Sequence, residues 1–273
     1  MLLAVLIQNI EKIMLVLNYK SEIKMKISII TICFNAADDL KKTIKSVRAQ
    51  VFNDYEYIIV DGGSKDATSE IIKSNADVIT KWVSEPDKGI YDAMNKGVKM
   101  ASGEWIIMMN AGDIFADSQV LTNVFENPIN DNITFLYGDT LSRQKNGKLL
   151  RRVTSWERGD VNHQAVIYRR DLHKEHGMYI VTKKIIISDY LFFIRIPQEQ
   201  VQKLNLAISI NDPNGISNQG NWARQQALCA DVVFRRRSFW GMVKFYCWKE
   251  IKGVLPTSFK DKLKILLGLQ KTY

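Results

Sequence analysis

The stretch KISIITICFN, from Lys26 to Asn35, decides the fold. Its residues from Ile27 to Ile32 are mostly β-branched and apolar, which is typical of a strand buried on both faces. Next along the chain, apolar residues recur at helical spacing at Leu40, Ile44, Val47 and Val51. A buried strand followed by an amphipathic helix predicts the start of a parallel α/β sheet with right-handed crossovers.

The same alternation continues outward from this stretch. We expect strands at 57–60, 78–83 and 105–109, and helices at 67–74 and 90–101. Beyond Leu121 the rhythm loosens, with strands expected near 133–136, 148–153 and 163–168, an apolar run at 185–187, and helices at 190–194 and 221–228. The sequence therefore predicts an α/β fold whose first half is the more regular.

Polar clusters follow three of the expected strands, at Asn35, Asp61–Ser64 and Asn110–Asp113. Ligands of open parallel sheets bind outside the carboxyl ends of the strands, so these clusters predict a binding site. Neither GxGxxG nor GxxxxGK[ST] occurs, which argues against a dinucleotide fingerprint and a Walker P-loop. Carboxylates here suit hydrogen-bond donors or a divalent cation. Mg²⁺ or Mn²⁺ could bridge Asp113 to phosphate oxygens.

Five blocks along this half resemble the family 2 glycosyltransferases with the GT-A fold, and most closely the bacterial enzymes that build surface polysaccharides. They are TICFN (31–35), SVRAQ (46–50), IIVDGGSKDAT (58–68), SEPDKGIYDAMNKG (84–97) and MNAGD (109–113). Looser blocks follow in HQAVIYRRDL (163–172), SDY (188–190) and GIS (215–217). The resemblance implies a Rossmann-like, mainly parallel sheet flanked by helices. We expect a catalytic domain at 26–231, an apolar N-terminal extension at 1–25 and a basic amphipathic helical tail at 232–273.

The resemblance also implies roles for individual residues. Asp61 would accept a hydrogen bond from the uracil N3–H, Asp113 would bind metal and diphosphate, and Asp189 would be the general base. His163 and Gln164 match a segment near the donor sugar and the acceptor. The positions expected to bind the donor are Thr31, Asn35, Asp61, Gly62, Ser64, Asp87, Lys88, Asn110 and Asp113. Many relatives carry two carboxylates in the metal motif, whereas Asn110 and Gly112 leave only Asp113 here.

The implied reaction is a single inverting displacement. A sugar would pass from a nucleoside-diphosphate sugar, expected to be a UDP-sugar, to a hydroxyl of a glycan or lipid-linked acceptor in polysaccharide biosynthesis. Two alternatives stay open. One is an inactive sugar-nucleotide-binding or scaffold protein, which the single carboxylate of the metal motif, Asp113, would favour. The other is a nucleotidyltransferase, which would need a basic, glycine-rich loop where residues 36–39 read AADD.

Several of these residues also have purely structural interpretations. Asp61 beside two glycines suits a turn, Asp113 could cap a helix, and Ser-Asp at 188–189 is an ordinary helix N-cap pair. His173 and His176 are expected on a surface helix, away from any metal. Cys33 is expected to be inert packing inside a strand.

Charge is concentrated in the tail. The net charge is +9, and residues 232–273 hold ten basic and two acidic side chains, which leaves the rest near neutral. This distribution argues against a nucleic-acid partner. Trp240, Val243, Cys247, Ile251 and Val254 share one helical face, and a second helix is expected after Pro256. Lysine-rich amphipathic helices with aromatic residues favour an anionic membrane surface.

Compartment and membrane topology follow from the remaining composition. No apolar run reaches the ~18 residues of a membrane span, and residues 1–24 read as an amphipathic helix or as an extension upstream of the true start. Three cysteines without a CxxC pair favour a reducing compartment. We therefore expect a cytoplasmic protein, peripheral on the inner face of the membrane.

Overall fold

The computed structural model describes residues 26–144, 146–211, 222–244, 247 and 270–272. Several sequence predictions therefore lie outside the described residues: the N-terminal extension at 1–25, the GIS block at 215–217 and the helix expected after Pro256.

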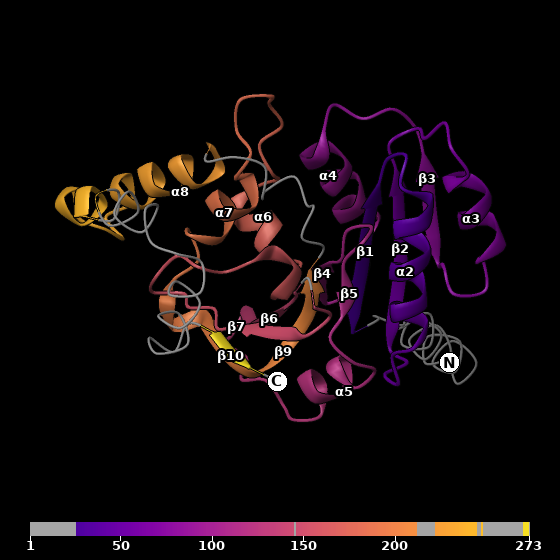
Figure 1. The fold of residues 1–273 in the computed structure, drawn as a ribbon, viewed down its shortest axis with the longest axis horizontal. Helices are drawn as coiled ribbons and strands as arrows, with labels where there is room; N and C mark the ends of the chain where they lie inside the picture. The colour runs from indigo at the N-terminus through magenta and orange to yellow at the C-terminus, as the bar shows by residue number, and fades with distance from the viewer. Residues whose placement is uncertain (1–25, 145, 212–221, 245–246, 248–269, 273) are drawn as a thin grey trace, which may run out of the picture.

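The first half of the chain forms the parallel part of one sheet (Figure 1). Its strands run side by side in the order β4-β1-β2-β3, and every neighbouring pair is parallel. The strands are β1 (Ile27–Cys33), β2 (Tyr55–Asp61), β3 (Lys81–Ser84) and β4 (Trp105–Met108). The helices between them are α2 (Ala37–Arg48), α3 (Thr68–Ser74) and α4 (Ile90–Met100). This half has the strand–helix alternation that the sequence predicts.

The second half extends the same sheet with mostly antiparallel pairs. β8 (Val166–Arg169) lies antiparallel between β4 and β6 (Phe135–Arg143), and β7 (Leu149–Arg152) continues beyond β6. The long β9 (Val201–Asn211) runs parallel to β6 and pairs with the short β5 (Ile114–Phe115). The edge strand β10 (Gln270–Thr272) pairs with β7.

Short helices complete this half. They are α5 (Val120–Phe125), α6 (Leu172–His176), α7 (Ser188–Phe193) and α8 (Trp222–Val233), with 3-10 turns η1 (His163–Ala165) and η2 (Gln198–Gln200). None of the helices in the described ranges has both the length and the apolar content needed to cross a bilayer.

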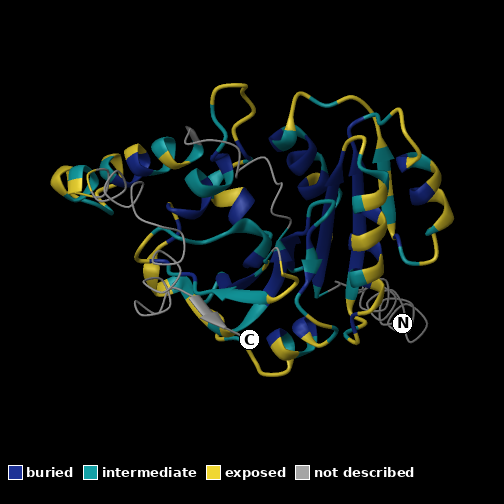
Figure 2. Cartoon of the chain, viewed as in Figure 1, coloured by how far each residue is buried: buried dark blue, intermediate teal, exposed yellow. Residues whose placement is uncertain are grey.

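The core lies on both faces of the sheet, as the dark strands of Figure 2 show. All seven residues of β1 are buried. Ile27 and Ile29 pack into the apolar cluster on the α2 side, whereas Ile30 and Ile32 pack into the cluster on the α4 side. The alternation follows from the two-residue period of a strand. This packing on both faces holds β1 in the middle of the sheet. The first polar side chains of the site follow its carboxyl end at Cys33.

The structure corrects three expectations. β3 begins at Lys81 rather than Val78, because 78–80 form the turn that leads into it. The segment 163–168 begins as a 3-10 turn rather than a strand. His173 is buried, because its ring stacks on Phe192 with 4.5 Å between centroids.

Candidate active site

The first group of polar residues lies where β1 and β2 end. These strands pair in register from Ile27 with Tyr55 to Cys33 with Asp61, so the loops that follow them lie side by side. We call Asn35, Asp61, Ser64, Ser84 and Asp87 the rim cluster.

Asp61 is the centre of the rim cluster and has no exposed surface. Its carboxylate accepts hydrogen bonds from Ser84 Oγ at 2.6 Å, from Ser64 Oγ at 2.5 Å and from the Ser64 backbone N–H at 3.1 Å. These bonds hold the loop after β2 in a fixed conformation. Asp61 therefore lies beneath the exposed residues of the rim cluster and holds them in place.

Asn35 and Ser84 are exposed at the rim, and Asp87 is half-buried beside them. Asn35 has a left-handed backbone (φ 48°), its N–H donates to Ser64 Oγ at 2.7 Å, and its Oδ1 accepts from the Lys65 N–H at 2.8 Å. Asp87 lies against Gly62, where a Cβ would come within 2.5 Å of its Oδ2. Three segments predicted to bind one ligand, ending in Asn35, Gly62 and Asp87, thus meet at one place.

Thr31 is placed differently from the sequence prediction. It is fully buried in the middle of β1, and its hydroxyl donates to the Met109 carbonyl at 2.6 Å and lies 3.0 Å from Tyr57 Oη. Because these neighbours enclose the hydroxyl, Thr31 ties β1 to the end of β4 and has no surface open to a ligand.

The second group is a hydrogen-bonded series of four side chains, which we call the polar line. Tyr91 Oη donates to Asp189 Oδ1 at 2.8 Å, and Asp189 Oδ2 lies 3.0 Å from His163 Nδ1. His163 Nε2 in turn lies 2.9 Å from Asn110 Nδ2. With the amide donating to Nε2, the neutral ring keeps its proton on Nδ1 and donates it to Asp189. Four segments that are distant in sequence are joined in this way.

Strand direction explains why the polar line forms. β8 is antiparallel to β4, so η1, which precedes β8, lies beside the carboxyl end of β4. This brings His163 to Asn110, immediately after β4. Asp189 lies in the first turn of α7, where Ser188 Oγ accepts from the Ile180 N–H at 2.5 Å, and Tyr91 lies in the first turn of α4. Gln164 is partly exposed in the same turn as His163.

The contacts of the polar line shift the pKa values of its members. Burial raises the pKa of Asp189, but the bonds from His163 and Tyr91 outweigh it and hold that pKa below its usual range. For His163 burial lowers the pKa, and the negative charges of Asp189 and Asp113 reverse the effect and raise it. Burial and the neighbouring Asp189 charge raise the pKa of Tyr91. Asp189 is therefore ionised at neutral pH, and Tyr91 remains a donor.

Asp113 lies beside the polar line in a turn closed by its N–H bond to the Asn110 carbonyl at 3.0 Å. Thr43 Oγ1 fixes the turn by donating to the Asp113 carbonyl at 2.8 Å. Asp113 is 4% exposed, and the buried Asn110 Oδ1 has no hydrogen-bond partner among the described residues. A carboxylate and an unsatisfied amide oxygen in one turn fit a hard divalent cation that takes its other ligands from phosphate and water.

Within the described part of the chain, no group of three or more His, Cys, Asp or Glu side chains is arranged to hold a metal ion. A cation here would thus depend on oxygens of a bound ligand. A cavity of about 610 Å³ borders the rim cluster at Asp87, between Asp87–Gly89 and Val181–Lys183, and Lys88 is exposed at its edge.

Tyr91 and Ser84 are site residues that no sequence pattern marks individually. Both lie in the block SEPDKGIYDAMNKG, and Tyr91 stands on the buried face of its helix, where a hydroxyl needs a partner. That requirement was the signal that could have marked it.

Comparisons with known proteins bear on the family and the fold. The family model described as Glycosyl transferase family 2 matches residues 28–191. A PGL/p-HBAD biosynthesis glycosyltransferase of Mycobacterium bovis (strain BCG) is 30% identical over 205 residues, which are 70% of this chain and 78% of that protein. An uncharacterized glycosyltransferase of Mycobacterium tuberculosis is 41% identical over 101 residues, which are 37% of this chain and 38% of that protein. The chain thus spans well under half of this second relative.

Solved structures share the fold at low identity. S. aureus TarS 1-349 in complex with UDP-GlcNAc has a TM-score of 0.61 and 18% identity, covering 77% of this chain and 66% of that one. The mannosyltransferase PcManGT from Pyrobaculum calidifontis, in complex with GDP-Man and Mn²⁺, has a TM-score of 0.60 and 13% identity, covering 77% and 64%.

The α/β sheet predicted from the sequence is therefore the GT-A-like fold of these structures. With the family model matching more than half of its residues, the chain belongs to glycosyl transferase family 2.

Proposed function

We propose that this protein transfers a sugar from a UDP-sugar to a hydroxyl of a glycan or lipid-linked acceptor, in one step that inverts the anomeric configuration. The observation that carries the proposal is the polar line. Asp189 is ionised, lies at the carboxyl edge of the sheet, and is held by His163 on one oxygen and by Tyr91 on the other. A carboxylate in this position suits a general base.

In the proposed step Asp189 accepts the proton of the acceptor hydroxyl. Its two oxygens accept the hydrogen bonds from Tyr91 and His163, and a carboxylate has about four lone-pair sites, which leaves room for this contact. The acceptor oxygen then attacks the anomeric carbon, and the bond from that carbon to the diphosphate oxygen breaks. The electron pair of this bond leaves with the nucleoside diphosphate. Because the acceptor oxygen attacks the face of the anomeric carbon opposite the leaving diphosphate, this single displacement inverts the configuration.

Donor binding is assigned to the rim cluster and the turn after β4. Asn35 and Asp87 offer polar atoms for the nucleoside, and Lys88 is exposed beside them. Support for a uridine nucleotide comes from the structural relatives, since TarS was solved with UDP-GlcNAc and a glucosyl-3-phosphoglycerate synthase of Mycobacterium tuberculosis with UDP and Mn²⁺.

A divalent cation, Mg²⁺ or Mn²⁺, is part of the proposal. Asp113 would hold it together with Asn110 Oδ1, and it would supply neutralisation of the charge that develops on the diphosphate. The chain's own contribution is the orientation of this turn, which Thr43 fixes through hydrogen bonds to Asp113 and to the Gly112 N–H, the latter at 3.0 Å.

The test compares Asp189→Asn with Asp38→Asn, a carboxylate on α2 whose side chain is 88% exposed. UDP-sugars are supplied with Mg²⁺ or Mn²⁺, and donor binding and turnover are both measured. We expect Asp189→Asn to bind the donor normally and to lose about 10²–10⁴-fold in turnover. Unchanged turnover in Asp189→Asn would contradict the assignment of the base. Donor binding without turnover in the unaltered protein would instead favour an inactive sugar-nucleotide-binding protein.

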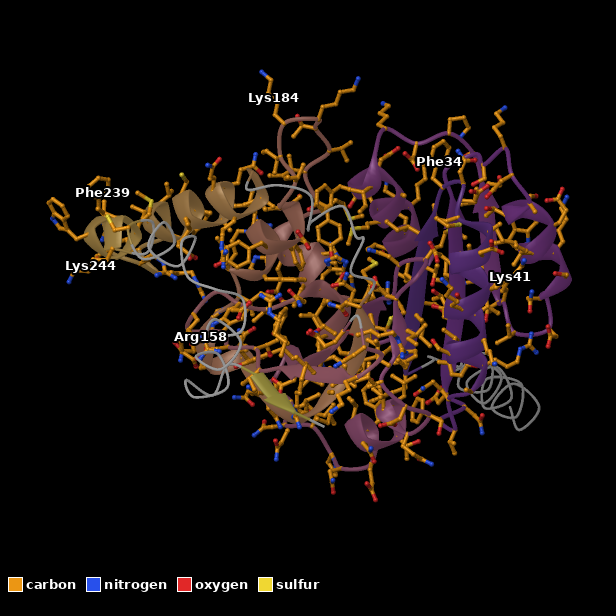
Figure 3. The ribbon with its side chains drawn as sticks, in the orientation of Figure 1. Phe34, Lys41, Arg158, Lys184, Phe239 and Lys244 are labelled. Atoms are coloured by element: carbon orange, nitrogen blue, oxygen red, sulfur yellow. The ribbon has the colours of Figure 1, made fainter. Side chains whose placement is uncertain are left out.

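We also propose that the chain from the end of α8 onward docks on an anionic membrane surface at the cytoplasmic face. Exposed apolar side chains gather there, with Val233 75%, Phe239 57% and Trp240 70% exposed, and Arg235 and Lys244 are exposed beside them. Figure 3 shows Phe239 and Lys244 at the end of the chain segment that projects farthest from the sheet. Aromatic residues flanked by cations suit the boundary between lipid headgroups and acyl chains.

Flotation with vesicles of anionic and of neutral phospholipid tests this docking. The double variant Phe239→Ala/Trp240→Ala is expected to lose most of its binding to anionic vesicles. Trp82→Ala, which removes an exposed tryptophan from β3, is the control and should bind normally. If the unaltered protein does not float with anionic vesicles, the docking proposal is wrong.

A further inference from the structure

Helix α8 lies beyond residues 28–191, the part of the chain that the family model matches, yet it packs directly on the helix that carries Asp189. Ala230 of α8 joins Ile187 and Ile194, which flank α7, in a small apolar cluster separate from the two main core clusters. The other face of α7, with Phe192 and Phe193, packs into the main core on the α4 side. Helix α7 is therefore held between the core and α8.

Polar contacts reinforce this packing at both ends of α8. Near its start, Gln226 Oε1 accepts from the Ile186 N–H at 3.0 Å, and Gln226 Nε2 donates to the Lys184 carbonyl at 2.5 Å. Near its end, Tyr190 Oη donates to Asp231 Oδ1. The first contact fixes the segment leading into α7, and the second fixes the residue next to Asp189.

Asp231 is the centre of the second contact and is 5% exposed. Besides the Tyr190 bond, it has Arg236 Nε at 3.8 Å and Arg237 Nε at 3.6 Å, and its carbonyl accepts from both of their backbone N–H groups. The carboxylate thus lies between Tyr190 and two cations from its own end of the chain.

The loop 153–160 packs against Tyr190 and Asp231. Gly159 has φ +63°, and a Cβ there would come within 2.4 Å of Tyr190 Oη, so the loop approaches the hydroxyl as closely as glycine allows. The guanidinium of Arg236 lies 4.7 Å from the centre of the Trp156 ring and donates to the Trp156 carbonyl.

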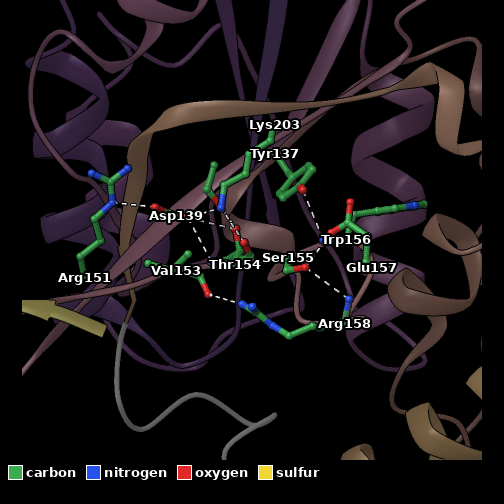
Figure 4. Close-up of polar contacts among 11 residues, drawn as sticks. Tyr137, Asp139, Arg151, Val153, Thr154, Ser155, Trp156, Glu157, Arg158 and Lys203 are labelled. Atoms are coloured by element: carbon green, nitrogen blue, oxygen red, sulfur yellow. Dashed lines mark hydrogen bonds and ion pairs between the residues drawn. The ribbon is translucent and has the colours of Figure 1, made fainter. Parts of the chain in front are cut away.

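The loop is itself fixed from its other side, as Figure 4 shows. The Thr154 N–H donates to Asp139 Oδ1 at 3.0 Å, and the Trp156 N–H donates to Tyr137 Oη at 3.3 Å. Both partners lie on β6. The loop that packs against Asp231 and Tyr190 is therefore itself bonded to β6. Through this loop the sheet holds Asp231 in place, and Asp231 in turn holds α7.

We infer that Asp231 is a positioning residue for sugar transfer. Through Tyr190 it fixes the orientation of α7, and so it holds Asp189 on His163 and Tyr91. This inference rests on the proposed function, because it gives Asp231 its effect through the proposed base. Helix α7 has only six residues, and so short a helix has little stability of its own. The direction of the Asp189 side chain then depends on what holds the helix from outside.

The test uses the full chain with Tyr190→Phe, Asp231→Ala and Asp231→Asn. We expect Tyr190→Phe and Asp231→Ala each to lower kcat about tenfold while the KM for the UDP-sugar stays unchanged, because the rim cluster is untouched. Combining the two should cost no more than Asp231→Ala alone, because both changes remove the same Tyr190–Asp231 hydrogen bond and only Asp231→Ala also removes the ion pairs to Arg236 and Arg237. Asp231→Asn keeps an acceptor oxygen for Tyr190 Oη and should recover most of kcat. Tyr55→Phe, at the start of β2, is the matched control.

A second measurement separates this inference from the proposed function. Amide hydrogen exchange in α7 is expected to become at least about tenfold faster in Tyr190→Phe and Asp231→Ala than in Asp231→Asn, whether or not a sugar is transferred. Unchanged exchange in α7 overturns the inference. So does faster exchange with unchanged kcat in a protein that turns over UDP-sugar. If no UDP-sugar is turned over, the proposed function fails and faster exchange still supports Asp231 as the residue that fixes α7.

Discussion

At the scale of single residues, His163 shows that the properties of a site residue depend on the side chains it contacts. Its ring joins Asn110 to Asp189, and its pKa is raised by the carboxylates although burial acts in the opposite direction. Sequence analysis placed His163 near the acceptor from the resemblance alone. Its contact with Asn110 exists because β8 runs antiparallel to β4, and no local pattern in the sequence indicates that pairing.

Asp113 gives a prediction at this scale. Replacing Asp113 by Ala removes the one carboxylate of the turn after β4, so the gain in UDP-sugar affinity on adding Mg²⁺ or Mn²⁺ should fall by about tenfold or more. Binding measured by calorimetry with and without the cation checks this. Asp117→Asn, a few residues farther along, is the control and should keep the full gain. Equal metal dependence in Asp113→Ala and the unaltered protein would contradict the role of Asp113.

Elements differ in how far the sequence alone predicts them. β1, β2 and β4 are buried on both faces and read as continuous apolar runs, so their positions are predicted within a few residues. β9 was missed, although Leu204, Leu206, Ile208 and Ile210 alternate with polar or small residues in the two-residue period of a strand. His173 was misplaced because a helix of five residues is too short to show a face by periodicity.

The contacts of Glu56 on β2 predict how the stability of the fold changes in acid. It is 1% exposed and accepts from Ser28 Oγ at 2.6 Å, from Lys81 Nζ at 2.9 Å and from the N–H of Ser102 at 2.5 Å. Burial raises its pKa, but these bonds outweigh it and lower the pKa from 4.5 to about 2. Because the folded state has the lower pKa, the stabilisation is complete above pH 4.5 and is lost as the pH falls towards 2.

We therefore expect the free energy of unfolding to fall by about 3 kcal/mol over that interval on account of Glu56. Denaturant unfolding at a series of pH values measures it. Glu56→Gln should be less stable at neutral pH and should show a correspondingly weaker acid dependence, whereas the exposed Glu70→Gln should behave like the unaltered protein. An identical acid dependence in Glu56→Gln would show that the interactions of Glu56 do not control it.

Helix α4 gives a packing prediction. A Cβ on Gly97 would lie 2.4 Å from Ile30 Cγ2, so the glycine lets α4 approach β1 closely. Gly97→Ala should lower the free energy of unfolding by about 1–3 kcal/mol, because the interior has no room for another methyl group. Denaturant unfolding checks this against Lys99→Ala, an exposed change on the same helix. A Gly97→Ala protein as stable as the control would mean that α4 can shift without cost.

At the scale of the whole molecule, the polar line joins two unlike halves. Tyr91 and Asn110 belong to the parallel half, which the family resemblance covers densely, and His163 and Asp189 belong to the antiparallel half, which it covers loosely. The fold class was predictable because it depends on the regular half. The full set of contacts at the site was not, because it depends on how the halves meet. The contact between Asp231 and α7 was not predictable either, because Asp231 lies outside every sequence block that resembles the family.

The order of these segments along the chain has a consequence for synthesis. A growing polypeptide acquires Asn35, Asp61 and Asp87 early, Asp189 much later, and α8 last of all. On the proposed function, a nascent chain therefore carries the residues proposed to bind the nucleotide well before the proposed base, and α8 follows both. On the proposed function, premature termination between β9 and α8 would leave a product that keeps the proposed nucleotide-binding residues and Asp189 but lacks the contacts that Gln226 and Asp231 make around α7.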